Sequence, residues 1–494
     1  MIHDELKYRI LQTLGFTPTA EQEHAIDVFT MFMTDRNEHV VMILRGSAGT
    51  GKTTLAGAIV QAMERLKQKL ILLAPTGRAA KVFSLNARHA AYTIHRRIYR
   101  QRIQVGELVS GMKSAGGLSA FSINDNLNRD TLFMIDEASM IANQGYGESA
   151  FGSGCLLDDL VQFVYNGLNC RMVLVGDKVQ LPPVGEDESP ALVADVLRCY
   201  GMKVYECDLN QVLRQRQQVM GEESGILWNA TMIRQMVTHD EMTQLPRIRF
   251  QGFADIQVVP GDELIESLAS SYGRVGMDET IVITRSNKRA NIYNQGIRNT
   301  VLDREEELCR GDQLMIVKNN YYWMEQIPSS PDEQKLPFIA NGDVAVVQRV
   351  KNVHELYGFR FAEVTLQFPD YDNYELTATV ILETLTSEAP ALTREQQEQL
   401  YNAVLEDYAD ITVKTDRLKK LKTDRYYNAL QVKFAYAVTC HKAQGGQWSH
   451  VYIDQGYMTD DMLTPDYIHW LYTAFTRATE KLFLVNWPKT QIQD

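Results

Sequence analysis

Residues 40–54 read VVMILRGSAGTGKTT, an apolar run followed by a glycine-rich turn that ends in Lys52, Thr53 and Thr54. The spacing from Gly46 to Thr53 is that of a P-loop, in which backbone N–H groups converge on phosphate oxygens between a buried strand and a helix. A glycine turn that binds nothing is the alternative, which the flanking strand and helix patterns disfavour. Lys52 is expected to reach the β- and γ-phosphates and Thr53 to hold Mg²⁺. The expected ATP-binding residues here are Gly46, Ser47, Ala48, Gly49, Thr50, Gly51, Lys52, Thr53 and Thr54.

Apolar runs recur along the first half of the chain. Besides 40–44, they lie at 70–74 (LILLA), 132–135 (LFMI), 172–175 (MVLV) and, more weakly, 203–205 (KVY). Each run ends in polar or glycine-rich residues, and helical stretches separate them. This alternation predicts a doubly wound α/β domain with a parallel sheet, whose ligands collect at the carboxyl ends of the strands.

A second set of apolar runs, at 280–284, 450–453 and 482–486, predicts another α/β lobe without a P-loop of its own. Two insertions break the rhythm: one is basic and then rich in glycine and serine, and the other alternates β-like runs with a polar helical stretch. The expected domains are a first lobe of residues 1–92 and 131–215, an insertion at 93–130, a second lobe of 216–343 and 434–494, and a small β-domain at 344–433.

The composition is that of an ordinary globular protein. The 494 residues are 23% charged and 45% apolar, and no apolar run approaches the roughly 18 residues that span a bilayer. We therefore expect a cytoplasmic protein with no membrane partner. Six widely spaced cysteines without a CxxC pair disfavour a disulfide framework or a structural zinc site. The net charge of −12 opposes association with a polyanion but does not exclude a local basic groove.

Two carboxylates follow the apolar run at 132–135, in the segment LFMIDEA. Hydrolysis of a phosphoanhydride needs a metal, an oriented water and positive charge at the γ-phosphate. We assign Asp136 to Mg²⁺ and Glu137 to the attacking water. The alternative is a surface acidic pair that caps the following helix.

Three further residues are candidates for contact with the γ-phosphate. Gln180 follows a strand in MVLVGDKVQLPPVG, where it is expected to lie near the γ-phosphate and detect it; the alternative is an ordinary glutamine in a turn. Arg214 and Arg477 lie in LNQVLRQ and YTAFTRA. An arginine that reaches across a cleft speeds phosphoryl transfer by about 10³- to 10⁵-fold and ties domain closure to the nucleotide. The alternative for either arginine is an ordinary surface ion pair.

In this order, the segments resemble the motifs of superfamily 1 helicases, in particular the RecD-like and Dda-like branch that moves 5′ to 3′ on single-stranded DNA. The matching segments are FTPTAEQ (with Gln22), GSAGTGKTT, LLAPTGRAAKV (Thr76), TIHRRI (His95), MIDEAS, GDKVQLPPVG, LNQVLRQ, ITRSNKRANIYN (Asn287), NGDVAVV (Asn341), YAVTCHKAQGGQW (His441) and YTAFTRA. The pattern departs from the family at Cys440 and at Gln447 and Trp448, which affects the detail of the DNA contacts.

The resemblance implies two RecA-like lobes, a duplex-splitting wedge in the first insertion and a barrel-like second insertion. It implies ATP and Mg²⁺ as cofactors, with Gln22 at the adenine. The implied catalytic residues are Lys52, Glu137, Gln180, Arg214 and Arg477. The implied DNA-binding residues are Pro75, Thr76, Thr93, His95, Asn287, Asn341, Thr439 and His441.

How the chain holds bases is left open by its sequence. Tyr92, Tyr99, Phe121, Tyr321, Tyr322, Trp323 and Trp448 are candidates for base stacking. Each aromatic residue is equally suited to a core. The basic run 414–425 is more typical of a solvated helix face than of a DNA track.

The sequence thus predicts an ATP- and Mg²⁺-dependent helicase or translocase that moves 5′ to 3′ on single-stranded DNA and opens tailed or forked duplexes. Because one chain carries both halves of the cleft, we expect it to work as a monomer. Two alternatives remain: a translocase that displaces proteins without unwinding, and a nucleotide-switched module that binds nucleic acid without turnover.

Overall fold

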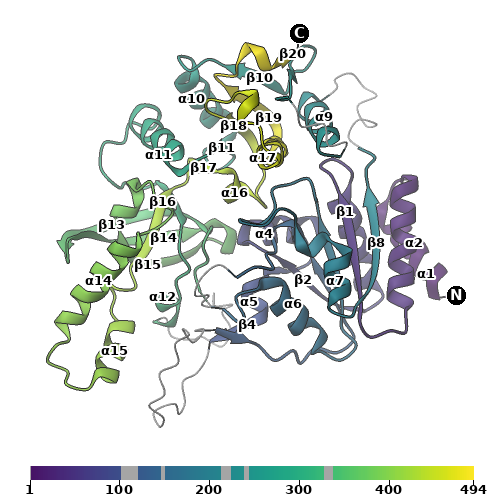
Figure 1. The fold of residues 1–494 in the computed structure, drawn as a ribbon, viewed down its shortest axis with the longest axis horizontal. Helices are drawn as coiled ribbons and strands as arrows, with labels where there is room; N and C mark the ends of the chain where they lie inside the picture. The colour runs from purple at the N-terminus through teal and green to yellow at the C-terminus, as the bar shows by residue number, and fades with distance from the viewer. Residues whose placement is uncertain are drawn as a thin grey trace.

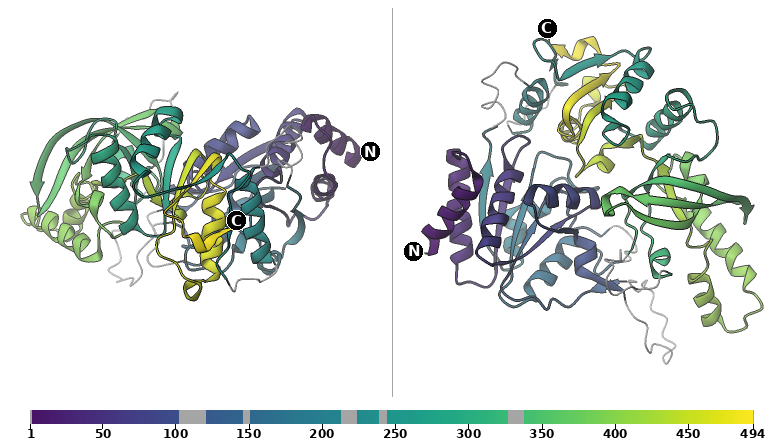
Figure 2. Two further views of the ribbon diagram at one scale, coloured as in Figure 1. Left: turned by 90° about the horizontal axis from the view of Figure 1, so that it is seen from above. Right: turned by 180° about the vertical axis from the view of Figure 1, so that it is seen from behind.

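The computed structural model describes residues 2–101, 121–145, 151–212, 224–238, 244–326 and 338–493. Figure 1 shows a first lobe at the lower right, a second lobe at the top and a barrel at the left. The barrel adjoins both lobes, and the views of Figure 2 show the same arrangement. The predicted fold class, two α/β lobes with a β-rich insertion in the second, is confirmed.

The first lobe is built on a parallel sheet with strand order β3–β2–β6–β7–β1–β8. The strands are β1 (Val40–Gly46), β2 (Lys69–Ala74), β3 (Ala91–Thr93), β6 (Thr131–Ile135), β7 (Arg171–Gly176) and β8 (Lys203–Leu209). The five predicted strands are confirmed, and β3 is an addition at the edge. Because β1 and β6 are covered on both faces, they consist of apolar residues almost throughout.

Helices cover both faces of this sheet. They are α1 (Ile2–Leu14), α2 (Ala20–Thr34), α3 (Lys52–Arg65), α4 (Gly77–Ala87), α5 (Ile94–Ile98), α6 (Leu156–Tyr165) and α7 (Ala194–Cys199). Val40, Met42 and Leu44 point into the core under α1, α2 and α3, while Val41 and Ile43 face α6 and α7. Each such fully buried side chain contributes about 1.5–3 kcal/mol to folding, and the two cores together hold the carboxyl ends of the strands in place.

The second lobe has a parallel sheet with strand order β10–β19–β18–β11–β17. Its strands are β10 (Ile256–Val259), β11 (Thr280–Thr284), β17 (Ala437–Thr439), β18 (Trp448–Asp454) and β19 (Ala478–Val485). Its helices are α9 (Gly225–Thr238), α10 (Leu264–Val275), α11 (Asn287–Gly296), α16 (Cys440–Ala443) and α17 (Pro465–Phe475), and a short pair, β9 (Ile248–Arg249) with β20 (Ile492–Gln493), lies beside the sheet. The three predicted strands are confirmed, whereas β10 and β17 were not predicted.

The insertion in the second lobe forms a closed barrel. Its strands are β12 (Gln313–Ile316), β13 (Val344–Leu356), β14 (Phe359–Phe368), β15 (Tyr374–Ile381) and β16 (Leu430–Phe434). Helix α12 (Tyr322–Glu325) follows β12, and α13 (Glu383–Thr386), α14 (Arg394–Asp407) and α15 (Lys414–Lys422) lie between β15 and β16. The expected range 344–433 is too short at its start, because closure requires β12 to pair with both β13 and β16. The basic run predicted as a solvated face forms α15, whose Lys419, Lys420 and Lys422 are exposed.

A short hairpin, β4 (Tyr99–Gln101) with β5 (Phe121–Ile123), leaves the first lobe. The stretch 102–120, predicted to belong to the wedge, lies outside the described residues. At the base of the hairpin, the ring of Phe121 lies 4.2 Å from that of Tyr321 and 5.2 Å from that of Phe151. Phe338 joins the same cluster, 5.2 Å from Tyr321. Aromatic packing therefore ties the hairpin base to the segments that flank β12 and β13.

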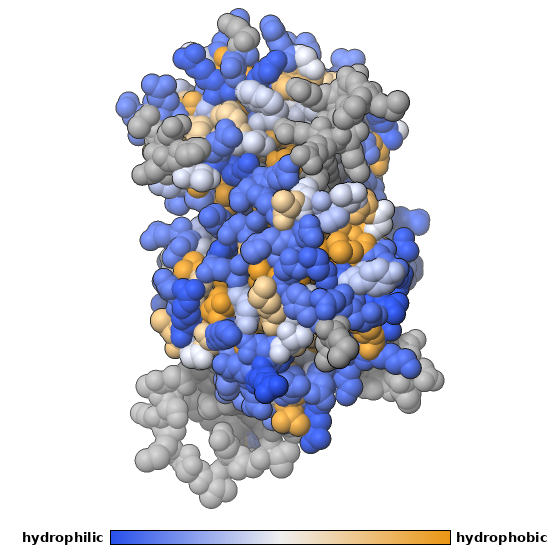
Figure 3. All heavy atoms as spheres, turned by 90° about the vertical axis from the view of Figure 1, so that its right-hand side faces the viewer, coloured by the Kyte–Doolittle hydropathy of each residue, from blue (hydrophilic) through white to orange (hydrophobic). Residues whose placement is uncertain are grey.

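Figure 3 shows one face of the molecule, on which hydrophilic residues predominate and apolar ones occur in small separate spots. Within the part of the chain that the structure describes, no helix has both the length and the apolar character required to cross a membrane.

A buried ion cluster joins the second lobe to the barrel. The carboxylate of Asp312 is fully buried and accepts hydrogen bonds from Arg298 Nη2 at 3.0 Å, Arg304 Nη1 at 2.7 Å and Tyr436 Oη at 2.9 Å.

Because an unpaired buried charge is costly, Asp312→Ala is expected to lower the free energy of unfolding by about 3–5 kcal/mol. Urea titration measures this loss. The exposed pair Arg394–Glu398 is the control, since Glu398→Ala is expected to have little effect. An equal loss in the two variants would contradict the prediction.

Candidate active site between the two lobes

The glycine-rich loop after β1 has the geometry of a phosphate cradle. Gly49 and Gly51 both have φ of 78°, in the left-handed region, and α3 begins at Lys52. A Cβ at Gly49 would also lie 3.0 Å from Leu227 Cδ2, so both backbone strain and space favour glycine there. Lys52 Nζ donates to Gly46 O at 2.7 Å, which places the ammonium over the loop. The start of α3 adds the positive end of a helix dipole.

The two predicted carboxylates follow β6 directly. Asp136 is buried, and its Oδ1 accepts the backbone N–H of Glu137 at 2.9 Å. Burial, with a smaller contribution from the Glu137 carboxylate, raises the pKa of Asp136 to about 7, although the Lys52 ammonium opposes the shift. Glu137 has a φ of 52°, an unusual value for a residue with a side chain. Strain of this kind concentrates at functional sites, and here it occurs at the second of two carboxylate residues that line a cavity together with the loop.

Gln180 lies deeper in the same cavity and is only 4% exposed. Its side-chain Oε1 is buried without a hydrogen-bond partner among the described residues. A buried amide oxygen without a partner costs free energy, so Gln180 Oε1 is an acceptor available to a polar ligand in the cavity.

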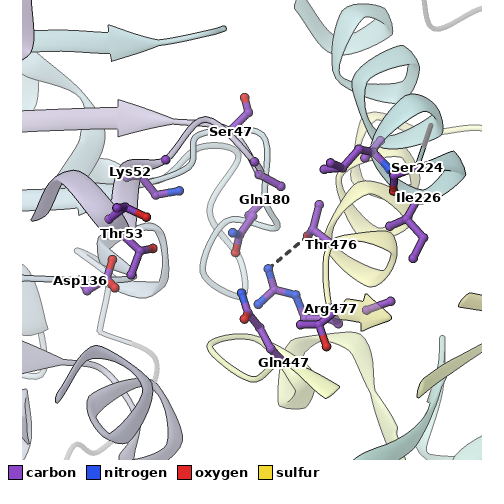
Figure 4. Close-up of a pocket in the computed structure, with 18 of the residues that line it drawn as sticks. Ser47, Lys52, Thr53, Asp136, Gln180, Ser224, Ile226, Gln447, Thr476 and Arg477 are labelled. Carbon is purple, nitrogen blue, oxygen red and sulfur yellow. Dashed lines mark hydrogen bonds between the residues drawn. The ribbon is translucent and has the colours of Figure 1, made fainter. Parts of the chain in front are cut away.

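Arg477 comes from the second lobe, just after α17, and is 2% exposed. Its guanidinium donates to Thr473 O at 3.0 Å, Gly446 O at 3.1 Å and Thr476 Oγ1 at 3.1 Å. All three acceptors are neutral, whereas buried charges normally meet an opposite charge. Figure 4 shows the guanidinium directed toward Gln180, on the side of the cavity that faces Lys52 and Asp136. This arrangement leaves a buried cation suited to an anionic ligand.

These residues line one cavity of about 500 Å³ between the lobes. Eleven predicted residues take part: Ser47, Ala48, Gly49, Gly51, Lys52, Thr53, Thr54, Asp136, Glu137, Gln180 and Arg477. Thr53 and Asp136 supply a hydroxyl and a carboxylate, the hard oxygen donors that Mg²⁺ prefers. The residues present therefore fit both a triphosphate and its metal ion.

Four predicted residues are placed differently or lie outside the described part. Gly46 and Thr50 support the loop from behind the cavity lining: Gly46 accepts from Lys52, and Thr50 Oγ1 donates to Ser47 O at 2.8 Å. Gln22 is fully buried; its Oε1 accepts Thr19 N at 3.1 Å and its Nε2 donates to Thr50 O at 3.4 Å. Gln22 thus ties the capping box of α2 to the loop, and its contact with adenine stays a prediction. Arg214 lies outside the described residues.

Sequence reasoning missed several groups that complete the cavity. Its other lining residues are Phe16, Thr17, Thr19, Ser224, Ile226, Leu227, Ala230, Gln447, Thr476, Ala478 and Thr479. Tyr472 of α17 was also missed: its hydroxyl accepts Ala48 N at 3.0 Å and donates to Asp177 Oδ2 at 2.7 Å. The available signal was its place five residues before Arg477 in the same motif, YTAFTRA.

The predicted DNA-binding residues gather at the carboxyl ends of neighbouring strands. Thr93 pairs with Ala74, so it lies beside Pro75 and Thr76 at one sheet edge. Thr439 pairs with Thr284, so it lies near Asn287, the first residue of α11. Thr76 caps α4 by accepting Ala79 N at 3.2 Å, and Thr93 caps α5 by accepting Arg96 N at 3.3 Å. Helix N-termini of this kind bind phosphate groups.

The other candidates for DNA contact lie in different environments. Asn341 is exposed and accepts a hydrogen bond from the Lys442 ammonium, while His441 is exposed at the start of α16. His95 packs 4.9 Å from the ring of Phe151, and burial lowers its pKa to about 4. Its imidazole is therefore neutral at physiological pH, and its contact with DNA stays a prediction. Among the aromatic candidates, Tyr99, Phe121 and Trp448 are buried.

The pKa of Asp136 leads to a pH prediction. Because a carboxylate must lose its proton before it binds Mg²⁺, lowering the pH from 8 to 6 through a pKa of about 7 is expected to weaken binding of Mg²⁺–nucleotide by roughly tenfold. Titration calorimetry in buffers of different ionisation enthalpy measures both the affinity and the protons released. Nucleotide with excess chelator is the control. An affinity for Mg²⁺–nucleotide that is independent of pH would contradict the prediction.

Comparison with known proteins agrees with this geometry. Residues 18–241 match a family model described as an AAA domain, and residues 434–485 match one described as a UvrD-like helicase C-terminal domain. The chain is 22% identical to the ATP-dependent DNA helicase Dda of Enterobacteria phage T4, over 86% of this chain and 90% of that protein. It is also 22% identical to the uncharacterized protein R530 of Acanthamoeba polyphaga mimivirus, over 91% and 96% of the two chains.

Among solved structures, a Bacteroides Pif1 helicase in complex with ADP-AlF3 and single-stranded DNA matches with a TM-score of 0.45 at 15% identity, over 97% of this chain and 95% of that one. Pif1 helicase from Candida albicans matches with a TM-score of 0.38 at 15% identity, over 97% and 96%. The first match covers the first lobe and extends through α9, the second covers the C-terminal part of the second lobe, and residues of both line the cavity that holds Lys52 and Arg477. The chain is thus similar to an ATP-dependent DNA helicase over most of its length, and its C-terminal part matches a helicase domain model.

Proposed function

We propose that this helicase hydrolyses ATP with Mg²⁺, moves 5′ to 3′ along single-stranded DNA and separates the duplex ahead of it. One observation carries the proposal: Lys52, Asp136 and Glu137 of the first lobe and Arg477 of the second lobe line a single cavity. Hydrolysis of a nucleotide bound there changes the charge that both lobes contact, so it drives opening and closing of the lobes.

Each group has a definite part in the reaction. The loop N–H groups and the Lys52 ammonium bind the β- and γ-phosphates, and Thr53 and Asp136 would hold Mg²⁺, which supplies charge neutralisation at the phosphates. Glu137 orients the attacking water and accepts its proton. The Arg477 guanidinium then stabilises the charge on the phosphoryl group in transfer.

Direct bonds between the lobes support coupling of this chemistry to movement. Leu181 N donates to Thr473 Oγ1 at 2.8 Å, and Gln444 Nε2 donates to Leu181 O at 2.7 Å. These contacts hold the segment that carries Gln180 against α17 and the end of α16. A change at Gln180 therefore reaches the elements of the second lobe that precede Arg477 and follow Thr439.

The choice of DNA rests on the edge of helix N-termini and on the relatives. Capped N-termini at Thr76 and Thr93 supply neutral donors, which release and rebind a phosphate backbone more readily than a dense lysine patch does. The T4 relative is named as a DNA helicase. The 5′-to-3′ direction follows from the resemblance to the RecD-like and Dda-like branch.

The hairpin of β4 and β5 supports unwinding over simple translocation. Its base is packed against Tyr321 and Phe338 of the second lobe's insertion. A wedge must be held rigidly, because opening a base pair costs on average about 1.4 kcal/mol of stacking. An anchored hairpin at the junction of the lobes meets that requirement.

The test compares duplexes with a 5′ tail, a 3′ tail and blunt ends, and measures strand separation and ATP hydrolysis together. We expect unwinding of the 5′-tailed duplex and ATPase stimulation by single-stranded DNA. Unwinding that requires a 3′ tail would refute the direction. Displacement of a bound protein without strand separation would favour the translocase, and hydrolysis unaffected by DNA would favour the nucleotide-switched module.

A further inference from the structure

Arg78 of α4 makes an unusual contact across the lobes. Its Cζ lies 4.2 Å from the centroid of the Trp448 ring, and its Nη2 donates to Gln447 O at 2.6 Å. Arg78 is in the first turn of α4, where the helix dipole disfavours a cation. The stability of α4 therefore does not explain an arginine at this position, whereas the stacking on Trp448 and the bond to the second lobe do.

The other side of the segment 446–448 contacts Arg477. Arg477 Nη1 donates to Gly446 O at 3.1 Å, and Trp448 N donates to Arg477 O at 2.9 Å. The packing is tight, since a Cβ at Gly446 would lie 2.4 Å from the Trp448 ring and 3.2 Å from Arg78 Cδ. Segment 446–448 is thus held between two arginines, one from each lobe, and its Gly446 carbonyl is bonded directly to the Arg477 guanidinium.

This segment also lies near both candidate ligand sites. Gln447 lines the nucleotide cavity, next to Arg477 in Figure 4. The residue directly before the segment, Gly445, is close to the cap of α4: a Cβ there would lie 3.1 Å from Oγ1 of Thr76. Arg78 lies two residues after Thr76, so a phosphate that binds the N-terminus of α4 acts on the residue that clamps segment 446–448.

We propose that Arg78 is a positioning residue that sets the Arg477 guanidinium through segment 446–448 and so makes ATP turnover respond to DNA at the N-terminus of α4. The proposal rests on the proposed function, because it assigns a route to the same DNA-stimulated hydrolysis. Arg78 is not among the residues that line the cavity, so it acts through Arg477 and makes no contact with the nucleotide.

The experiment compares Arg78→Ala and Arg78→Lys with Lys81→Ala as the matched control. Lys81 is also on α4 and also bonds outside its lobe, to Pro369 O at 2.9 Å in the barrel, and its polar contacts among the described residues do not include segment 446–448. A misplaced catalytic group costs about 10²-fold in rate, and we expect a loss of that size in DNA-stimulated kcat for Arg78→Ala, with nucleotide Kd and Tm nearly unchanged. Arg78→Lys is expected to lose part of kcat, because lysine keeps the charge without the planar stack. If Arg78→Ala does not fold, Arg78→Lys is compared with the wild type in its place.

A double substitution tests the route. If Arg78 acts through Arg477, then adding Arg78→Ala to Arg477→Ala is expected to cause no further loss of kcat. Losses that multiply would overturn the proposal, as would an equal loss for Lys81→Ala or a fall in nucleotide affinity that matches the fall in kcat. Failure of the proposed function is a separate result: the wild type itself would then show no stimulation by DNA. In that case the same comparison on basal turnover still decides the role of Arg78.

Discussion

Replacing Arg477 with alanine is expected to lower DNA-stimulated ATP turnover by about 10³- to 10⁵-fold while nucleotide binding is retained. The guanidinium lines the cavity from the second lobe and bonds only neutral acceptors among the described residues. Its positive charge is therefore available to the phosphoryl group, whose charge spreads most in the transition state. The P-loop in the other lobe supplies most of the ground-state contacts, so binding survives.

Single-turnover hydrolysis and nucleotide titration together measure this split between chemistry and binding. The substitution also removes the Arg477 donor from Gly446 O, at about 1–3 kcal/mol for a buried acceptor left unpaired, whereas Thr473 O keeps the hydrogen bond from Thr476 Oγ1. Tm is therefore measured alongside, and Arg477→Lys serves as a variant that keeps the charge but lacks the planar guanidinium. Arg274, an exposed arginine on α10, is the control. Weakened nucleotide binding with normal turnover would contradict the prediction that Arg477 stabilises the transition state.

The parts of the fold that were predictable are those whose residues are buried on both sides. The runs 132–135 and 172–175 are apolar throughout because helices cover both faces of their strands. The strands β3 and β17 have only three residues each, AYT and AVT, and depend on their neighbours for pairing. Strand β12 was missed for a related reason: its place is fixed by barrel closure with β13 and β16, which are distant in the sequence.

The candidate site also contains residues that the sequence predicts and residues that it does not. The loop residues and the pair Asp136 and Glu137 were predictable, because each belongs to a short pattern whose spacing reflects its chemistry. Tyr472 and Gln447 were missed because docking of the second lobe, which has no local signature, brings them to the loop and the cavity. The sequence around Gln22 fits two roles. One is the contact with adenine that the family resemblance implies, and the other is a T-x-x-Q capping box with Thr19. The structure contains the capping box.

Replacing Lys52 with alanine is expected to lower hydrolysis by at least about 10²- to 10³-fold, the loss typical of removing one preorganised charge or donor from a transition state. It is expected to leave folding nearly intact. Among the described residues the ammonium makes one hydrogen bond, to Gly46 O; a bond from a charged donor contributes at most about 1.5–3 kcal/mol to the free energy of unfolding, and less where water reaches the donor. The side chain is only half-buried and lies on the cavity wall, outside the apolar core.

The measurement pairs the ATPase rate with thermal unfolding in the absence and presence of Mg²⁺–nucleotide. Ligand that binds the native state raises Tm, so the wild type is expected to gain thermal stability from the nucleotide and Lys52→Ala to gain less. Lys67, an exposed lysine just after α3, is the control. Lys52 also opposes the raised pKa of Asp136. Its removal therefore shifts that pKa further upward, and the pH below which Mg²⁺ binding weakens rises with it. A large fall in Tm without nucleotide would show instead that Lys52 supports the fold.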